Sequence, residues 1–257
     1  MRTAISRGSD SVEEARELLA AARANGFDGV QLKPHQYRDF APDAGAFREA
    51  FGELSGLARA GLVAYPGHEP GGWRAALEPL ISFGAELGAE LICISAGVRP
   101  REMPAGGYPE VADRLAQIGR LAREHGLRIS LHNHAGTAFA TADDLRRLFD
   151  HLSPDVCGLT LDTAHAGKAG EPDIAALAAE FWTFLDNVHL KDLSAHGEFC
   201  PLGTGTLDLV PLLELLRAEG YSGWLVADEE SPGIGPDEAC RLSMEYLVEH
   251  NVAQPGL

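Results

Sequence analysis

The sequence is poor in positive charge and has no long apolar run. Its 257 residues carry 21 Lys and Arg against 38 Asp and Glu, a formal net charge of −17 at pH 7. Nucleic acid and anionic membrane surfaces are therefore poor partners. No stretch approaches the roughly 20 apolar residues of a membrane span, and residues 1–10 lack an apolar stretch of signal-peptide length. We expect a cytoplasmic protein with neither a nucleic-acid nor a membrane partner.

Several common motifs are also missing. Four cysteines occur without a C-x-x-C pair, which argues against a thiolate zinc site, and we expect Cys93 and Cys157, in apolar runs, to be buried thiols. No G-x-G-x-x-G follows the first expected strand, and neither a P-loop nor G-x-S-x-G occurs. These absences argue against a dinucleotide-binding fold, a P-loop nucleotidase and a nucleophile elbow.

The chain does contain a regular alternation of short apolar runs with amphipathic stretches. Eight strands, each followed by a helix, predict a single-domain (β/α)8 TIM barrel over residues 1–257. A doubly wound open sheet is the competing architecture, weakened by the missing glycine fingerprint. The strands are expected at residues 2–6, 28–33, 62–65, 90–95, 127–132, 156–161, 184–190 and 223–228.

Capping residues and breakers place the helices between these strands. Ser11 with Glu14 forms a capping box that opens the first helix, and Asn25 closes it. The third helix begins near Trp73 and is expected to break or kink at Pro79.

Histidines gather where the expected strands end. A histidine in any one loop would be unremarkable, but seven of the ten lie at or just after strand ends, and these loops form the active face of a barrel. Carboxylates follow the same strands, so a ring of His and acidic groups predicts a metal site. The seven histidines are His35, His68, His132, His134, His165, His189 and His196.

The strands expected to end near residues 132 and 161 carry the first candidates. Side chains alternate with period two, so His132 and His134 share a face, where one could ligate a cation and the other reach substrate. Asp162 is a hard ligand for a divalent cation, and His165 follows three residues later. The alternatives are histidines bonded to the backbone and an Asp162 that caps the next turn.

The strands expected to end near residues 190 and 228 carry the second set. His189 and Lys191 share a face, which would place a metal ligand beside a cation for an oxyanion. Asp192 could orient either neighbour. Asp228 and Glu230 also share a face, whereas the intervening glutamate points the other way. Solvated surface charges are the alternative for the lysine and for each acid.

Glu230 and two further residues are candidate substrate contacts. Lys33 follows the strand expected at residues 28–33 on the same face as Gln31, and His68 follows the strand expected at 62–65. An ordinary surface position is the alternative for both.

These segments together resemble the xylose isomerase-like TIM-barrel superfamily over nearly the whole chain. Within it, the chain is most similar to the sugar phosphate isomerase/epimerase group, which includes inosose dehydratases and inosose isomerases. The resemblance is carried by residues 26–32 (GFDGVQL), 132–134 (HNH), 161–165 (LDTAH), 189–192 (HLKD), 202–205 (LGTG) and 221–224 (YSGW).

The resemblance implies one divalent cation held by Glu, Asp, His and Glu after strands five to eight. Asp162 and His189 match this pattern, whereas His132 and Asp228 stand where the family has glutamates. His165 matches a histidine that contacts substrate. Sugar epimerases of the group shuttle a proton between the two glutamates, so these departures weaken that mechanism here, and inosose dehydratases are closer at His132. Apurinic endonucleases share the fold but need a basic DNA face, which a charge of −17 does not provide.

These features predict a metal-dependent isomerase or epimerase of a sugar, sugar phosphate or cyclitol. One Mn²⁺, Co²⁺, Mg²⁺ or Zn²⁺ would acidify a C–H beside a carbonyl. His134 or His165, both expected to titrate near neutral pH, would remove the proton to give an enediolate beside Lys191. An inosose-type dehydratase using the same site is the runner-up. A non-catalytic carbohydrate-binding barrel is the alternative of another class, and a homo-oligomer is one option.

Overall fold

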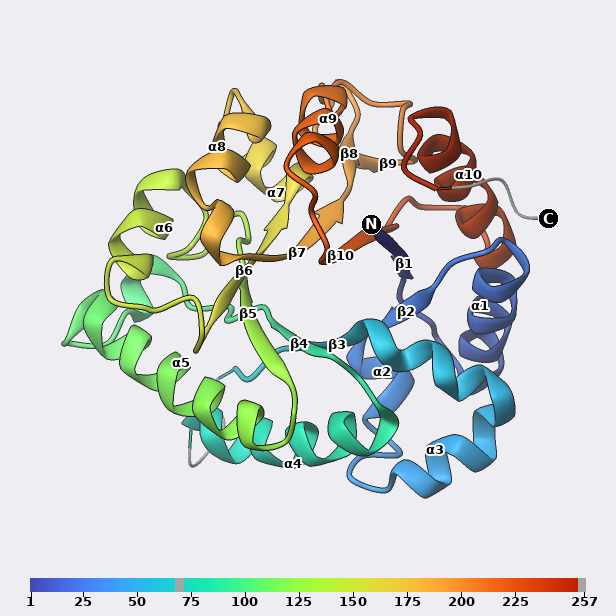
Figure 1. Ribbon diagram of the computed structural model, residues 1–257, viewed down its shortest axis with the longest axis horizontal. Helices are drawn as coiled ribbons and strands as arrows, with labels where there is room; N and C mark the ends of the chain where they lie inside the picture. The colour runs from blue at the N-terminus through green and yellow to red at the C-terminus, as the bar shows by residue number, and fades with distance from the viewer. Residues whose placement is uncertain (68–71, 254–257) are drawn as a thin grey trace.

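The predicted (β/α)8 barrel is confirmed. A computed structural model describes residues 1–67 and 72–253. Eight parallel strands close into a barrel in the order β1-β10-β7-β6-β5-β4-β3-β2, and Figure 1 shows them at the centre of a ring of helices. The strands are β1 (Arg2–Ser6), β2 (Gly29–Leu32), β3 (Gly61–Ala64), β4 (Leu91–Ile94), β5 (Arg128–His132), β6 (Gly158–Asp162), β7 (Leu185–Leu190) and β10 (Trp224–Asp228).

The helices lie outside the strands. The side chain of Ser11 caps α1 as expected. The break expected at Pro79 is wrong, because α4 continues through it while Leu77 and Ile81 are buried on either side. The α-helices are α1 (Val12–Ala24), α2 (Pro34–Tyr37), α3 (Ala44–Phe51), α4 (Gly72–Leu87), α5 (Gly107–Glu124), α6 (Ala142–Phe149), α7 (Thr163–Lys168), α8 (Ile174–Glu180), α9 (Val210–Ala218) and α10 (Pro236–Glu249), with 3-10 segments at Gly52–Ala60, Pro100–Glu102 and Trp182–Phe184.

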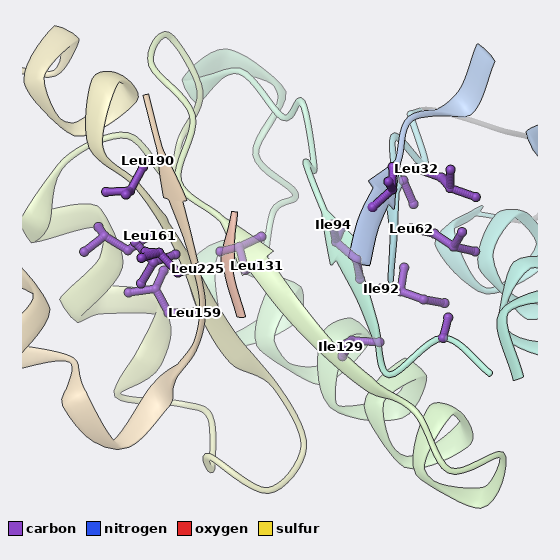
Figure 2. Close-up of a cluster of buried hydrophobic side chains, with 14 of the residues drawn as sticks. Leu32, Leu62, Ile92, Ile94, Ile129, Leu131, Leu159, Leu161, Leu190 and Leu225 are labelled. Atoms are coloured by element: carbon purple, nitrogen blue, oxygen red, sulfur yellow. The ribbon is translucent and has the colours of Figure 1, made fainter. Parts of the chain in front are cut away.

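The alternation of side chains along each strand separates an apolar layer from a polar barrel interior. Leucines and isoleucines such as Leu131 and Leu161 are fully buried in the main apolar cluster (Figure 2). The residues between them, among them Ser130 and Thr160, hydrogen-bond to one another across the strands. Polar side chains therefore point into the barrel along these strands, and the last of them lie at the carboxyl ends with the candidate site residues.

Two short elements follow the carboxyl ends of β6 and β7 and were not predicted from the sequence. Helix α7 starts directly at the end of β6, and a two-stranded antiparallel hairpin, β8 (Asp192–Leu193) with β9 (Phe199–Cys200), follows β7. Within the described residues, no helix is both long and apolar enough to cross a membrane.

Candidate active site at the carboxyl ends of the strands

Four neighbouring strands bring the predicted metal ligands together. The barrel register pairs Asp162 at the end of β6 with His189 of β7, and Asp228 ends the adjoining β10. Ligand atoms of these three buried residues lie within 4.8 Å of one another. A second such group joins Asp162 to His132 and His165. Asp162 belongs to both groups and is the centre of the site.

The Asp162 carboxylate is held by its local structure. Its Oδ1 accepts a hydrogen bond of 2.8 Å from the backbone N–H of His165, which makes Asp162 the N-cap of α7. Its Oδ2 faces His132 Nε2 at 3.3 Å and Lys191 Nζ at 3.6 Å. The cap expected as an alternative role is therefore real, and it leaves Oδ2 directed toward the other site residues.

His189 is oriented by Gln31, from the opposite side of the barrel. Its Nε2 lies 2.6 Å from Gln31 Oε1, an acceptor, so this nitrogen carries a proton. Within the described residues, its buried Nδ1 has no hydrogen-bond partner and lies 3.8 Å from Asp162 Oδ2 and 3.5 Å from Asp228 Oδ2. Burial lowers the pKa of His189, but the nearby Asp228 carboxylate raises it to about 10. The two carboxylates favour a positive charge at Nδ1, which is a proton in the metal-free protein and would be the cation in the loaded one.

His132 also presents an unpaired nitrogen. Its Nε2 faces Asp162, and its buried Nδ1 has no hydrogen-bond partner in the part of the chain that the structure describes. Burial lowers the pKa of His132 to about 4, so the ring is neutral at pH 7. Neutral imidazole is the form that binds metals.

Lys33 and Lys191 converge on the acidic groups that follow β10. Lys191 Nζ lies 2.5 Å from Asp228 Oδ2 and 2.8 Å from Glu230 Oε2. Lys33 Nζ lies 2.9 Å from Asp228 Oδ1 and also pairs with Glu230. The structure thus brings together the lysines and acids that the strand alternation placed on common faces.

Burial and charge pairing set the protonation of this cluster. Burial lowers the pKa of Lys191, but Asp228 and Asp162 raise it well above its ordinary value. Burial raises the pKa of Asp162 and Asp228, yet Lys191 is the main cause that holds both well below their usual range. The carboxylates are ionised and the ammonium is charged at neutral pH.

His134 and His165 form a pair on the β5 and β6 side. Their ring centroids are 3.8 Å apart. His134 Nδ1 lies 3.0 Å from the carbonyl oxygen of Ala135, so Nδ1 donates and Nε2 keeps the lone pair. His165 Nδ1 accepts from the Ala135 N–H at 3.4 Å, so its Nε2 carries the proton. One ring can accept a proton and the other can donate a hydrogen bond.

The expectation that His165 titrates near neutral pH is wrong. Its side chain is buried beside His132, His134 and Lys191, and burial is the largest cause that lowers its pKa to about 3. His165 is therefore neutral through the physiological range and suited to hydrogen bonding.

A small cavity lies among these groups and opens toward a larger hollow. The cavity has a volume of about 30 Å³, room for roughly one water or ion, and His132, His189 and Asp228 line it. The neighbouring hollow of about 450 Å³ shares Lys33, Tyr65 and Glu230 with it. Tyr65 is 54% exposed. The hollow is large enough for a sugar-sized molecule.

The residues present fit a divalent cation. Among the described residues, His189 Nδ1 is buried without a hydrogen-bond partner and faces ionised Asp162, and His132 turns its Nε2 to the same carboxylate. Mixed nitrogen and carboxylate donors suit Mn²⁺, Co²⁺ or Zn²⁺. Asp162 and His189 are the best placed ligands, because the Asp228 oxygens are shared with two ammonium groups.

Some predicted residues lie elsewhere. His68 lies outside the described residues. Asp192 makes no direct hydrogen bond to the side chain of His189 or Lys191 in the described structure; its carboxylate accepts from backbone N–H groups of the segment 201–207. The glutamate between Asp228 and Glu230 accepts a hydrogen bond from the Ser231 N–H instead of joining the cluster.

Two residues of the site had no predicted role. Asn133 exchanges hydrogen bonds with the backbone of Asp162, at 2.7 Å and 3.1 Å, and so fixes the end of β6. Its position between two inward-facing histidines signals that it faces the neighbouring strand. Phe199 lies against Lys191 and His165. The glycine at 197, flanked by polar residues, was an available signal for its hairpin.

Known proteins resemble this chain in sequence. Residues 19–250 match the family model described as xylose isomerase-like TIM barrel. Inosose dehydratase from Clostridium beijerinckii is 30% identical over 159 residues, 54% of this chain and 53% of the relative. Inosose dehydratase from Geobacillus thermodenitrificans is 31% identical over 157 residues, 53% and 52% of the two chains. The chain thus spans about half the length of the curated relatives it matches.

Solved structures share the fold. The 3-keto-D-glucoside 4-epimerase of E. coli has a TM-score of 0.76 and 21% identity, covering 97% of this chain and 99% of that one. The IOLI protein with a bound zinc atom has a TM-score of 0.75 and 15% identity, covering 97% and 98%. Because the family model spans most of the residues that build the barrel and the site, the chain belongs to the xylose isomerase-like TIM barrel family.

Proposed function

We propose that this chain is a metal-dependent dehydratase that removes the proton beside the carbonyl of a cyclitol-like or sugar-like hydroxyketone and then expels a neighbouring hydroxyl. The proposal rests on the arrangement of a base and of acidic ammonium groups on two opposite sides of the site, which we call its two poles, with Asp162 between them. A histidine with a free lone pair, His134, stands on the β5 side, and the ammonium groups of Lys33 and Lys191 stand beside the acids that follow β10.

Asp162 and His189 would hold the cation, with His132 and Asp228 as further ligands. A bound divalent cation supplies Lewis acidity, which polarises the substrate carbonyl and acidifies the adjacent C–H. Gln31 keeps the lone pair of His189 on Nδ1 by accepting from Nε2, as residues behind metal-binding histidines commonly do.

His134 would act as the general base. Its Nε2 takes the α-proton while Nδ1–H donates to the Ala135 carbonyl and holds the ring in place. The Nε2–H of His165, in the stacked neighbour, donates to the substrate oxygen on which negative charge develops.

Lys191 would complete the elimination. As the C–O bond breaks, its ammonium gives a proton to the leaving hydroxyl, which departs as water. His134 then releases its proton to solvent, and Lys191 takes one up from solvent, which restores the starting state. Asp228 and Glu230 keep the ammonium charged and in place until the C–O bond breaks. An ammonium acid on one side of the site and an imidazole base on the other suit elimination better than proton shuttling between two like bases.

The relatives support this choice. The two reported sequence relatives are named inosose dehydratase, although each matches over about half its length. The probable 3-DHS dehydratase AsbF from Bacillus anthracis has a TM-score of 0.73 at 14% identity, covering 96% of this chain and 99% of that chain, which supports the fold alone.

Isomerisation or epimerisation is the second candidate, because Glu230 offers a carboxylate at the pole opposite His134. The enediolate would be common to both reactions, and the proton would return at another carbon instead of a hydroxyl leaving. The D-allulose 3-epimerase of Methylomonas sp. shares the fold with a TM-score of 0.76 at 18% identity, covering 97% of this chain and 98% of that chain.

Product mass distinguishes the two reactions. Inososes and hydroxyketoses should be incubated with the Mn²⁺-loaded protein and analysed by mass spectrometry. Dehydration removes one water from the substrate mass, whereas isomerisation leaves the mass unchanged. His134→Gln should slow turnover by roughly 10²- to 10⁴-fold without weakening metal binding.

The exposed variant Glu198→Gln provides the control and should match the wild type. Turnover that persists in both His134→Gln and His165→Gln would show that neither is the base. A requirement for added NAD⁺ would overturn the mechanism, and the absence of turnover together with absent metal binding would favour a non-catalytic barrel.

A further inference from the structure

We infer that Asp192 and Phe199 form a positioning device for Lys191 and His165, built from the β8–β9 hairpin. The inference rests on the proposed function only for the roles of Lys191 and His165, since the contacts themselves are independent of it. Asp192 follows Lys191 directly and points to the other side of the strand, away from the metal-ligand cluster.

Asp192 is buried, and its carboxylate accepts hydrogen bonds from backbone amides of the loop 201–207. Its Oδ1 accepts from the N–H groups of Leu193 and Leu207 at 2.8 Å and 3.2 Å, and its Oδ2 accepts from Gly203 and Gly205 at 3.1 Å and 3.0 Å. In the described part of the chain, all its hydrogen-bond donors are backbone amides. Charge-assisted bonds of this kind offset the cost of burying the carboxylate and fix the loop to the end of β7.

The loop sequence is shaped around this carboxylate. A Cβ at Gly205 would overlap the Asp192 side chain, and Gly203 has a φ of +79° with the ring of Tyr246 2.8 Å from its Cβ position. A larger residue at 205 would displace the loop from Asp192, and one at 203 would strain the backbone and displace Tyr246. The Asp192 carboxylate therefore accounts for the glycine at 205, and the positive φ and the Tyr246 ring account for the glycine at 203.

The loop 201–207, which is bound to Asp192, supports the hairpin that holds Phe199 against Lys191 and His165. Leu193 pairs with Phe199 across the hairpin, and the N–H of Thr206 donates to the Leu193 carbonyl at 2.7 Å. The Phe199 ring lies 4.5 Å from Lys191 Nζ and 5.5 Å from the His165 ring centroid. An ammonium over an aromatic face is attracted to it, and the attraction is larger at a buried position such as that of Lys191.

The same segment packs against α7, which carries His165. The Cβ position of Gly167 lies 2.9 Å from the Leu207 side chain and 3.4 Å from that of Leu193, so a larger residue there would displace the Leu207 side chain. Lys168, on the same helix, places its ammonium 3.6 Å from the Phe199 ring centroid. The hairpin thus joins the end of β7 to α7 and holds Lys191 and His165 at a fixed spacing.

Lysine labelling of the metal-free protein tests the device without any substrate. Acetylation by acetic anhydride, read by peptide mass spectrometry, gives the rate at Lys191 relative to Lys33, a second buried lysine of the same cluster that does not contact Phe199 in the described structure. Phe199→Leu should raise this ratio by about fivefold, because the ring no longer covers the ammonium. Phe199→Tyr should restore the wild-type ratio.

Asp192→Asn provides the second arm. An amide keeps one acceptor oxygen and loses the other, so backbone hydrogen exchange in residues 201–207 should accelerate and the Lys191 ratio should rise with it. Glu198→Gln, in the exposed turn of the hairpin, should change neither measurement.

Equal labelling ratios in Phe199→Leu and the wild type would overturn the inference, as would faster loop exchange in Asp192→Asn with an unchanged ratio. If Asp192→Asn does not fold, the comparison of Phe199→Leu with Phe199→Tyr still decides the role of the ring. Because no substrate is used, failure of the proposed dehydration leaves this result readable. With a substrate in hand, Phe199→Leu should lower kcat more than it changes KM.

Discussion

The two ends of the barrel both carry buried or half-buried charge, but they use it differently. At the amino ends, the guanidinium of Arg2 binds Glu90 at 2.5 Å and stacks on Trp224 at 4.3 Å, and Arg128 binds Asp186 at 2.6 Å. At the carboxyl ends, the charges of the cluster other than Glu230 are buried, and among the described residues one nitrogen each of His132 and His189 has no hydrogen-bond partner. One end satisfies its charges within the chain, whereas the other leaves binding capacity for a ligand.

Cavity size does not distinguish the two ends. The hollow among Arg2, Arg128 and Trp224 has a volume of about 350 Å³, whereas the carboxyl end has a cavity of about 30 Å³ among the site residues and a neighbouring hollow of about 450 Å³. The carboxylates at the amino end already have guanidinium partners, so nothing there demands a cation. The difference teaches that unsatisfied chemistry, rather than volume, locates the site in this barrel.

Asp162→Asn is the sharpest test of the carboxyl end and should have the largest effect. The amide keeps the shape and the cap of α7 but removes the charge shared by both groups of possible ligands. Affinity for Mn²⁺ should fall by at least about 100-fold, and turnover by on the order of 10³-fold. Calorimetric titration measures the first and the dehydration assay the second.

The metal-free Asp162→Asn protein should still fold, because Asp228 and Glu230 continue to pair with Lys33 and Lys191. Unchanged metal stoichiometry and affinity in both Asp162→Asn and His189→Gln would contradict the assignment of the ligands.

Gly158→Ala tests the amino end, with a smaller effect that falls on stability. A Cβ at Gly158 would overlap the carboxylate of Asp186 and approach the Phe184 carbonyl oxygen at 2.8 Å. Displacing Asp186 from Arg128 and straining the start of β6 should cost about 2 kcal/mol of unfolding free energy. Urea denaturation measures this loss, and metal affinity of the folded protein should be unchanged. A loss of metal affinity without a loss of stability would contradict the claim that the amino end serves stability and the carboxyl end serves binding.

The sequence was sufficient to predict the fold and the grouping of the candidate metal ligands, and both predictions have the same physical basis. Period-two alternation fixes which face of a strand a residue occupies, and parallel strands bring their carboxyl ends to one place, so His132, Asp162, His189 and Asp228 could be grouped without coordinates. The barrel itself follows from eight repeats of one pattern.

Other features depend on contacts between segments that no local pattern encodes. The proton positions on His134 and His165 depend on the backbone of Ala135, and the lowered pKa of His165 comes from its burial. Asp192 binds amides more than ten residues further along the chain, through a hairpin with only two residues in each strand. Short elements of this kind leave too weak a periodicity to be recognised in a sequence.

Glu90→Gln should produce the smallest effect, and its pH dependence tests whether the amino end is purely structural. Burial raises the pKa of Glu90, but hydrogen bonds from Arg2, Trp224 and Arg59 lower it below the ordinary 4.5. The charge therefore stabilises the folded protein above about pH 4.5, and this contribution is lost as pH falls through the lower folded-state pKa. Because Glu90 and Arg2 are more than one third exposed, solvent weakens the pair, and the loss at pH 7 should be about 1 kcal/mol.

Urea denaturation of wild type and Glu90→Gln at pH 7 and at pH 3 measures this difference, which should shrink toward zero at the lower pH and also fade in high salt. Glu53→Gln is the matched control, since its side chain is 95% exposed and lies 3.7 Å from Arg23, so it should leave stability unchanged. A difference that persists at pH 3 would assign the effect to packing against Trp224 rather than to charge. A fall in metal affinity would mean that the amino end contributes to the site after all.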